Sequence, residues 1–451
     1  MDDFDVIVIG AGPAGEVLAG RCADGGLSVA LVERELIGGE CSYWGCVPSK
    51  TLIRPGDVVA AARRVPGVCA ELDVAAAFAQ RDYMTSSWSD EGQLPWLRSH
   101  RISLVRGVAR LDGPRAVVVG SRRLAARRAV VLATGTRAAL PPIPGLAEAQ
   151  PWDNRDATAV KALPRRLLVL GGGAIGVEMA QAYRRLGSEE VSVVEAAPRL
   201  LFREEPFAGD EVRSALEAEG VRVVVGAVID RVDRDGTDGP VVMSLADGSL
   251  VGDELLVAAG RRVMTDELGL DTVGLAAGRH IEVDDQLRAV GVDWLYAIGD
   301  CNGRAQLTHM GKYQARIAAD VILGRDVRDL AGVDVVPRVT FTDPQVCAVG
   351  LTEAQARSRG LTIRTVAYGT GDVAGAYTQG NGIRGTSKLV VDSARQVILG
   401  ATFTGPGVQE LLHSATVAII GEVPLERLWH AVPSFPTISE VWLRLLETYG
   451  L

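Results

Sequence analysis

The sequence predicts an α/β protein with two doubly wound domains and a third, α+β domain at the C-terminus. A glycine-rich pattern between apolar segments occurs twice, at Gly10 and again at Gly171. From Val335 onward, short strands and helices are mixed without such a pattern. At about 150 residues per domain, a chain of 451 residues accommodates roughly three domains.

The first pattern lies in FDVIVIGAGPAGEVLAGRCADGGLSVALVE, where a strand leads into Gly10, Gly12 and Gly15 and a second strand ends at Glu33. In such a unit the first glycine permits a tight turn, the second lets backbone amides approach a pyrophosphate, and the third lets helix pack on strand. The helix N-terminus adds unpaired N–H groups and a positive dipole end, and the acid accepts from ribose hydroxyls. The segment therefore predicts a dinucleotide site.

The second pattern, RLLVLGGGAIGVEMAQAYRRLGSEEVSVVE, repeats these positions at Gly171, Gly173, Gly176 and Glu195. A single GxGxxG run is a weak signal. Two copies, each with its strands, helix and acid in place, are a strong one and predict two dinucleotide sites.

The segments around these patterns are predicted as follows. A helical stretch from Pro55 to Leu97 precedes apolar strands at 102–131 that end in VVLATGT, and the cluster PPIPG at 141–145 indicates a domain boundary. The run VVMSLADGSLVGDELLVAAG predicts a β-hairpin with Asp247-Gly248 at its turn. A later helix, from about Lys312 to Leu323, returns to the first domain.

Composition limits the class of protein. Apolar residues make up 47% of the chain and charged residues 23%, and no apolar run reaches the roughly 18 residues of a membrane span. No basic region precedes the first apolar stretch, so it predicts a core strand rather than a signal peptide, and the expected location is the cytoplasm. A formal net charge of −9 argues against a nucleic-acid partner.

Of the six cysteines, only Cys41 and Cys46, in GGECSYWGCVPSK, lie close in sequence. A bridge between them requires Cα atoms within about 7 Å, which a helical turn provides. A positive helix end lowers the pKa of a thiol from its free value of about 8.5. The aromatic residues between the cysteines, Tyr43 and Trp44, either shape an acceptor pocket or fill the space under the turn. A cysteine pair after a dinucleotide pattern indicates a protein disulfide set against a flavin.

Together these motifs resemble the pyridine nucleotide-disulfide oxidoreductases, the flavoprotein family of dihydrolipoyl dehydrogenase, glutathione reductase and mercuric reductase. The resemblance spans nearly the whole chain and rests on the two glycine patterns, CxxxxC followed by PSK, ATGT, AIGD and PTISE. It implies an FAD-binding domain at 1–145 and 266–330, an NAD(P)-binding domain at 146–265 and a dimerisation domain at 335–451. A homodimer follows from the last of these.

The resemblance also implies cofactor sites. FAD is expected to bind at the first pattern together with Thr134, Gly135 and Asp300, and the nicotinamide nucleotide at the second. Glu195 favours NADH, because a carboxylate accepts from a free 2'-hydroxyl and repels a 2'-phosphate. Arg199, four residues later, leaves the use of NADPH open.

The resemblance assigns catalytic roles as well. Cys41 exchanges with substrate, and Cys46 contacts the flavin. Lys50 and Glu178 pair beside the reactive edge of the ring, where a fixed cation stabilises charge on the reduced flavin. Without the resemblance, Lys50 is a surface lysine and Glu178 a first-turn acid favoured by its helix dipole.

The C-terminal run HAVPSFPTISE departs from the family pattern. Members that reduce dithiols carry a histidine directly before Pro-Thr; here Phe435 takes that position, while Pro436, Thr437 and Glu440 match. General acid–base help typically contributes about 10² to 10⁴ in rate, so exchange with a dithiol should suffer most and reduction of the flavin should be spared. His430 is an alternative proton carrier if it folds back toward Glu440.

Three functions remain open. The leading hypothesis is an FAD enzyme that passes electrons from NADH to a small-molecule acceptor, such as a quinone. The second is a dihydrolipoyl dehydrogenase-like reductase of a disulfide, and the third is a non-catalytic redox sensor or binding subunit. Mercuric reductase is disfavoured because no cysteine follows Cys347, and no metal-binding motif is present.

Overall fold

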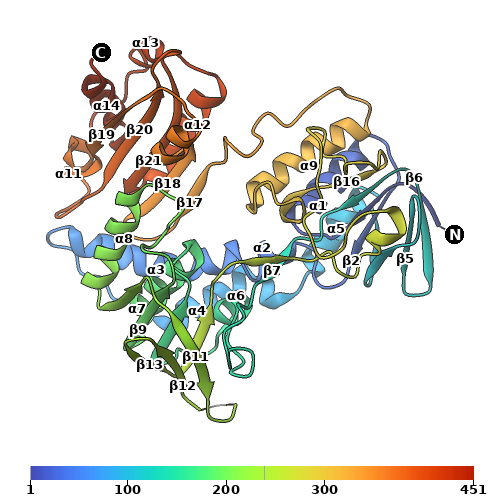
Figure 1. Ribbon diagram of the computed structural model, residues 1–451, viewed down its shortest axis with the longest axis horizontal. Helices are drawn as coiled ribbons and strands as arrows, with labels where there is room; N and C mark the ends of the chain where they lie inside the picture. The colour runs from blue at the N-terminus through green and yellow to red at the C-terminus, as the bar shows by residue number, and fades with distance from the viewer. Residues whose placement is uncertain (1, 238) are drawn as a thin grey trace. The chain divides into compact units, whose positions relative to one another are not determined.

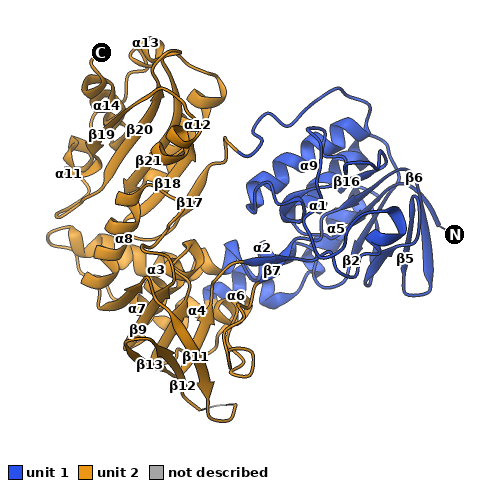
Figure 2. Cartoon of the chain, viewed as in Figure 1, with its two compact units in different colours: residues 1–48, 80–138, 261–333 blue, residues 49–79, 139–260, 334–451 orange. Residues whose placement is uncertain are grey.

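The computed structural model describes residues 2–237 and 239–451, and the chain forms two compact units (Figures 1 and 2). Unit 1 comprises residues 1–48, 80–138 and 261–333; unit 2 comprises residues 49–79, 139–260 and 334–451. The predicted segments 146–265 and 335–451 thus lie almost entirely in one compact unit, and their division into separate domains stays a prediction.

Unit 1 is built on a seven-stranded sheet in the order β3-β2-β1-β6-β5-β4, with β16 also paired to β6. Strands β1, β2, β3, β6 and β16 are parallel where they pair with one another, whereas β4 and β5 pair antiparallel. The strands are β1 (Asp2–Ile9), β2 (Val29–Glu33), β3 (Ser103–Arg106), β4 (Ala109–Leu111), β5 (Ala116–Val119), β6 (Arg122–Leu132) and β16 (Leu295–Ala297). Continuous apolar runs are typical of such doubly covered parallel strands.

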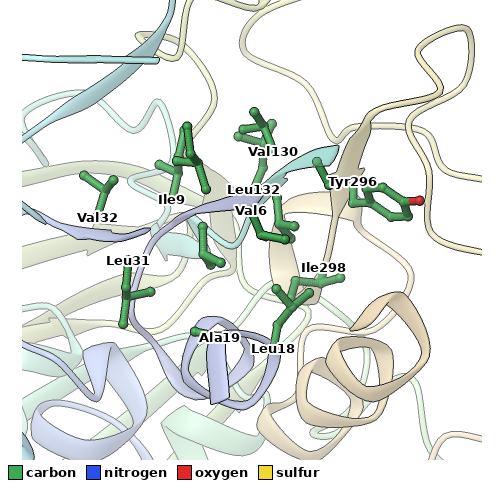
Figure 3. Close-up of a cluster of buried hydrophobic side chains, with 14 of the residues drawn as sticks. Val6, Ile9, Leu18, Ala19, Leu31, Val32, Val130, Leu132, Tyr296 and Ile298 are labelled. Atoms are coloured by element: carbon green, nitrogen blue, oxygen red, sulfur yellow. The ribbon is translucent and has the colours of Figure 1, made fainter. Parts of the chain in front are cut away.

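The core of unit 1 includes the contact between this sheet and helix α1 (Pro13–Asp24). Figure 3 shows Leu18 and Ala19 of α1 below the strands that carry Val6 and Leu31, and all four side chains are fully buried. Helix α9 (Thr308–Ile322) packs against α1, and it begins four residues before the predicted start at Lys312.

The other elements of unit 1 are short and connect the strands. They are α2 (Gly39–Tyr43), η1 (Ser86–Trp88), η2 (Glu91–Gln93), α5 (Leu94–Ser99), the ribbon of β7 (Thr136–Ala138) with β15 (Arg261–Val263), η3 (Leu270–Val273) and η4 (Gly299–Asn302). Two helices continue from one unit's segment into the other's along the chain: α3 (Cys46–Arg64) and α4 (Val74–Met84). The helical stretch predicted from Pro55 to Leu97 is therefore several helices.

The first half of unit 2 contains a parallel sheet in the order β10-β9-β8-β14 and an antiparallel sheet of β11, β12 and β13. The predicted hairpin is formed by β12 and β13, but Leu245 pairs with Gly248, so the turn is Ala246-Asp247. The elements are α6 (Asn154–Ala159), β8 (Arg166–Leu170), α7 (Ala174–Leu186), β9 (Glu190–Glu195), α8 (Pro206–Ala218), β10 (Val221–Val225), β11 (Ile229–Arg234), β12 (Val241–Leu245), β13 (Gly248–Gly252) and β14 (Glu254–Val257).

The second half of unit 2 is a five-stranded antiparallel sheet in the order β17-β18-β21-β20-β19. Helix α12 packs against β18 and β21, and α14 packs against β19. The elements are β17 (Arg338–Thr340), β18 (Gln345–Gly350), α10 (Glu353–Ser358), β19 (Ile363–Gly369), η5 (Thr370–Asp372), α11 (Ala374–Tyr377), β20 (Thr386–Asp392), β21 (Val397–Gly405), α12 (Val408–Ile420), α13 (Leu425–Leu428), η6 (Ile438–Glu440) and α14 (Val441–Tyr449).

The predicted fold class is confirmed. One α/β fold of the dinucleotide-binding type forms unit 1, a second forms the first half of unit 2, and an antiparallel C-terminal region forms the second half of unit 2. Among the described residues, no helix combines the length and the apolar composition that a bilayer crossing needs.

Candidate active site

The first glycine pattern forms a cradle at the carboxyl end of β1. Gly10 has φ +102°, and a Cβ there would lie 2.4 Å from the carbonyl oxygen of Ala133. A Cβ on Gly15 would lie 1.9 Å from the carbonyl oxygen of Gly10, so this glycine lets α1 pack closely. Gly12, the N-cap of α1, faces open space. Gly10 and Gly15 thus have the tight turn and the close packing predicted for them, and the role of Gly12 beside a pyrophosphate stays a prediction.

The other residues predicted to bind FAD gather at the same edge of the sheet, because each follows a parallel strand. Glu33 ends β2, Thr134 follows β6, and Asp300 follows β16. The Glu33 carboxylate accepts from the amides of Ala11 and Glu35, both at 2.7 Å. Ligands of open α/β sheets bind at this carboxyl edge.

Three observations indicate that this edge fits a bound dinucleotide. The Thr134 hydroxyl is buried and has no hydrogen-bond partner in the described part of the chain. A buried polar group in this state is costly unless a ligand or water satisfies it. The carboxylate of Asp300 is held by the Thr136 hydroxyl at 2.6 Å, which in turn accepts from Arg261 Nε at 2.6 Å. Open space over Gly12 leaves room for phosphates beside the start of α1.

The second glycine pattern reproduces this geometry in unit 2. Gly171 has φ +112°, a Cβ on Gly176 would again lie 1.9 Å from a carbonyl oxygen, that of Gly171, and Gly173 faces open space. Glu195 accepts from the amides of Gly172 at 2.6 Å and Ala197 at 2.7 Å. The carboxylates of Glu33 and Glu195 therefore each hold the backbone of a neighbouring turn, and each keeps further lone pairs that could accept from a ribose.

Arg199 is held close to the second pattern. Its Nη2 donates to the carbonyl oxygens of Phe202 at 2.8 Å and Glu204 at 3.2 Å, and its guanidinium lies 4.6 Å from the centre of the Phe202 ring. These contacts engage Nη2 and one face of the guanidinium, whereas the buried Nε has no hydrogen-bond partner among the described residues.

The cysteine pair lies where two helices meet. Cys41 is on α2, and Cys46 is the first residue of α3. Between them, Trp44 is the C-cap of α2, and its amide donates to the Glu40 carbonyl at 2.9 Å. The chain passes close to Cys41 at Gly45, where a Cβ would lie 3.4 Å from Cys41 Cα. The two thiols are hydrogen-bonded to each other, and Cys46 Sγ lies 3.4 Å from Thr308 Oγ1. The predicted helical turn is interrupted at Trp44-Gly45, and this break brings the sulfurs together.

The prediction of a lowered thiol pKa is wrong for Cys41. The hydrogen bond with Cys46 and burial both raise the pKa of the Cys41 thiol, and negative charge on Cys46 raises it further. Cys46 is exposed and begins α3, where the helix dipole favours an anion. In the reduced pair, Cys41 therefore holds its proton more tightly than a free thiol does.

Residues distant in sequence support the cysteine segment. Tyr43 is buried, its hydroxyl donates to the Ser89 carbonyl at 3.3 Å, and its own carbonyl accepts from Trp88 Nε1 at 3.0 Å. Asp90 accepts from the Ile37 amide at 2.8 Å. Tyr43 thus fills the space under the turn. Sequence reasoning missed Trp88, Asp90 and Thr308, because nothing in their local pattern marks these contacts.

Lys50 and Glu178 form an ion pair in unit 2, with Nζ 2.7 Å from Oε2. Glu178 is 4% exposed, and its Oε1 accepts from the Phe341 amide at 2.9 Å. The Lys50 ammonium also lies 4.8 Å from the centre of the Phe341 ring. The alternative that Glu178 is a first-turn acid is wrong, because Glu178 is the fifth residue of α7 and lies beyond its first turn. Lys50 is fixed by a carboxylate and an aromatic face.

The C-terminal motif differs from what a proton-transfer pair would require. Phe435 is 76% exposed, and Glu440 is buried with its carboxylate bound to Arg444 Nη2 at 2.7 Å and to the Ala374 amide at 3.3 Å. In the described part of the chain, His430 is not among the hydrogen-bond partners of Glu440. Arg444 was missed by sequence reasoning, although it lies one helical turn after Glu440.

Two dinucleotide-binding folds and the cysteine pair Cys41 and Cys46 that follows β2 define the class of FAD-dependent oxidoreductases with a redox-active cysteine pair. The family model for pyridine nucleotide-disulphide oxidoreductases matches residues 4–315, and the model for the dimerisation domain of that family matches residues 336–445. The chain belongs to the pyridine nucleotide-disulphide oxidoreductases, whose members use FAD and NAD(P)H.

Relatives of several activities resemble it over nearly its full length. Mercuric reductase of Lysinibacillus sphaericus is 30% identical over 97% of this chain and 81% of that protein. Dihydrolipoyl dehydrogenase of Chlorobaculum tepidum is 34% identical over 97% of this chain and 95% of that protein. The structure of the HOCl-induced flavoprotein disulfide reductase RclA from Escherichia coli superposes with a TM-score of 0.86, at 28% identity, over 98% of this chain and 99% of that one.

Proposed function

We propose that this protein is a homodimeric enzyme that oxidises NADH and, with FAD as its cofactor, passes the electrons to an electrophilic small-molecule acceptor such as a quinone. The observation that carries the choice of acceptor is the Glu440–Arg444 ion pair. Phe435 occupies the family's histidine position, and Arg444, which stays protonated at neutral pH, neutralises the glutamate instead. An acceptor that needs little proton transfer from the protein suits such a site.

The residues at the carboxyl edge of unit 1 are proposed to hold FAD: Gly10, Gly12, Gly15, Glu33, Thr134, Gly135 and Asp300. When bound, the flavin supplies two-electron chemistry between nicotinamide and acceptor. Thr136 and Arg261 orient the Asp300 carboxylate, and Glu33 orders the turn before α1. These contacts hold the Asp300 and Glu33 carboxylates in place for binding of FAD.

Gly171, Gly173, Gly176 and Glu195 are proposed to hold NADH. The preference over NADPH rests on charge: Glu195 repels a 2'-phosphate, and Arg199, the nearby cation, is engaged with two carbonyls and the Phe202 ring. Lys50, fixed by Glu178, is proposed to supply the positive charge that stabilises the reduced cofactor.

The test compares NADH oxidation with a quinone and with oxidised lipoamide in one preparation of the yellow holoenzyme. Brisk quinone reduction with slow lipoamide reduction supports the proposal. Rapid lipoamide reduction that is lost in Glu440→Gln contradicts it, because that result requires a working proton-transfer residue beside Glu440.

A disulfide reductase is the second candidate, favoured by the direct contact between the Cys41 and Cys46 thiols. In this case the Cys41 thiol first gives up its proton, and the resulting thiolate attacks a substrate disulfide and releases one substrate thiolate, which takes up that proton. Cys46, as the thiolate, then attacks Cys41 Sγ, forming the Cys41–Cys46 bond and releasing the second substrate thiolate. The variant Cys41→Ser separates the candidates. Persistent quinone reduction in this variant means that electrons do not leave through the dithiol, whereas loss of every acceptor activity, with NADH still reducing the cofactor, means that they do.

Other activities of the relatives are not proposed. A non-catalytic sensor or binding subunit would show tight complex formation and negligible turnover with all acceptors.

A further inference from the structure

The segment that joins β17 to β18 is attached to helix α7 at two points. The Phe341 amide donates to Glu178 Oε1 at 2.9 Å, and the Asp343 amide donates to Gln181 Oε1 at 2.7 Å. Alternate residues of an extended chain point the same way, and residues three apart share one face of a helix. Two neighbouring side chains of α7 therefore match two alternate amides of this segment.

Gln181 holds the segment from both sides. It is 3% exposed, its Nε2 donates to the Asp343 carbonyl at 3.0 Å, and the same nitrogen donates to Glu219 Oε1 at 2.9 Å. The Gln181 side-chain amide thus donates to the carbonyl of Asp343 and accepts from its amide. Two hydrogen bonds to one residue fix both the position and the orientation of the Asp343 backbone.

The Asp343 carboxylate ties the same segment to a second helix. Its Oδ2 accepts from Arg64 of α3 at 2.8 Å and from Arg185 of α7 at 2.9 Å. Arg185 also binds Glu219 and Asp57. The ends of α3 and α7 and the segment 341–343 are therefore one charged network, which borders a cavity of about 750 Å³.

This network continues to the Lys50–Glu178 pair. Lys50 and Arg64 are both on α3, Glu178 and Gln181 are both on α7, and Phe341 touches both members of the pair. With Oε1 occupied by the Phe341 amide, Glu178 presents Oε2 to Lys50, and the ring below limits where the ammonium lies.

We infer that Gln181 and Asp343 are positioning residues: they hold Phe341 against Glu178 and thereby fix the Lys50 ammonium. Neither side chain reaches the pair itself, and both act through the backbone of 341–343. The inference rests on the proposed function only where it concerns the effect of the Lys50 charge on reduction of the cofactor. The fixing of Lys50 is testable without turnover.

The central variant is Gln181→Met, which keeps a side chain of similar length and removes the three hydrogen bonds. Wild type and variant holoenzyme are treated at one pH with an amine-acylating reagent, and labelling of Lys50 is measured by mass spectrometry relative to Lys388. Lys388 is bound to Glu205 and Glu353 in the same unit, so it reports general loosening. We expect the Lys50 to Lys388 ratio to rise by about tenfold, the equivalent of one weakened charge-assisted hydrogen bond.

Three further variants separate positioning from structural damage. Gln181→Glu combined with Glu219→Gln restores an acceptor for the Asp343 amide and preserves net charge, and it should return the labelling ratio toward that of wild type. Asp334→Ala removes an exposed ion pair with Arg359 in the same unit and should leave the ratio unchanged. Asp343→Asn provides the same test if Gln181→Met does not fold.

Stopped-flow reduction of the bound cofactor by NADH, with Lys50→Met as reference, distinguishes a failure of the inference about Gln181 from a failure of the role proposed for Lys50. If Lys50→Met slows reduction and Gln181→Met changes neither reduction nor labelling, the inference is wrong while the proposed function stands. If Lys50→Met leaves reduction unchanged, the role proposed for Lys50 fails, and labelling alone decides whether Gln181 positions it.

Discussion

Arg444 binds Glu440 across one turn at the start of α14, with Nη2 2.7 Å from Oε1, and it also binds Glu447 at 2.9 Å. Glu440 is thus paired with a cation that does not exchange its proton near neutral pH.

The first prediction is that Phe435→His combined with Arg444→Leu creates dithiol activity. A histidine beside a released Glu440 supplies general acid–base help, which is worth about 10² or more in rate. We therefore expect reduction of lipoamide by NADH to increase at least about tenfold, while quinone reduction changes little. Phe435→Leu with Arg444→Leu is the matched control, and an equal gain in that variant would refute the role of the histidine.

The second prediction compares two glycines of one motif. Gly176→Ala places a Cβ 1.9 Å from the Gly171 carbonyl oxygen, whereas Gly173→Ala meets nothing within 4 Å. Gly176→Ala should lower the free energy of unfolding by about 3 kcal/mol, as overpacking does. Gly173→Ala should leave it unchanged without nucleotide but raise the KM for NADH several-fold, because the methyl group enters the space expected for the pyrophosphate. Urea unfolding and steady-state kinetics measure the two effects, and equal behaviour of the variants would contradict this assignment of space.

The third prediction concerns the nicotinamide nucleotide. Glu195→Ala removes the repulsion of a 2'-phosphate and an acceptor for the ribose, so the ratio of kcat/KM for NADH to that for NADPH should fall by about tenfold or more. The additional change Arg199→Leu should lower NADPH use again only if Arg199 leaves the Phe202 and Glu204 carbonyls in the absence of Glu195. An unchanged ratio in Glu195→Ala would place cofactor selection elsewhere.

The fourth prediction is a dependence of stability on pH that originates at Asp57. Burial raises the pKa of Asp57 to about 6, although Arg185 opposes this shift. Between the unfolded and folded pKa values the folded protein binds this proton and the unfolded chain does not, so Asp57 favours the folded state more as the pH falls. Relative to Asp57→Asn, wild type should gain on the order of 2–3 kcal/mol between pH 7 and pH 4. Urea unfolding at several pH values measures the difference, and parallel curves for the two proteins would exclude this origin.

The sequence predicted the parts of the site that depend on local geometry. Gly10 and Gly171 lie at turns with positive φ that favour glycine, and Gly15 and Gly176 lie where any Cβ would collide with backbone. These constraints act within one strand, turn and helix, so residue type and spacing reveal them.

Contacts between distant segments could not be predicted in this way. The pKa of Cys41 depends on burial and on the actual orientation of the Cys46 thiol, neither of which follows from the spacing of the cysteines. Phe341 and Asp343 meet α7 through backbone amides, which every residue type except proline carries, so no side-chain pattern marks them. Arg444 is different: its spacing from Glu440 was visible, but many such helical pairs are exposed and contribute little.

Helix α3 places Cys46 at its first residue and Lys50 one turn later. Because an α-helix rotates by about 100° per residue, inserting or deleting a single residue between them would move Lys50 to another face of the helix, away from Glu178. This stretch can therefore accept changes of residue type over evolutionary time far more readily than changes of length.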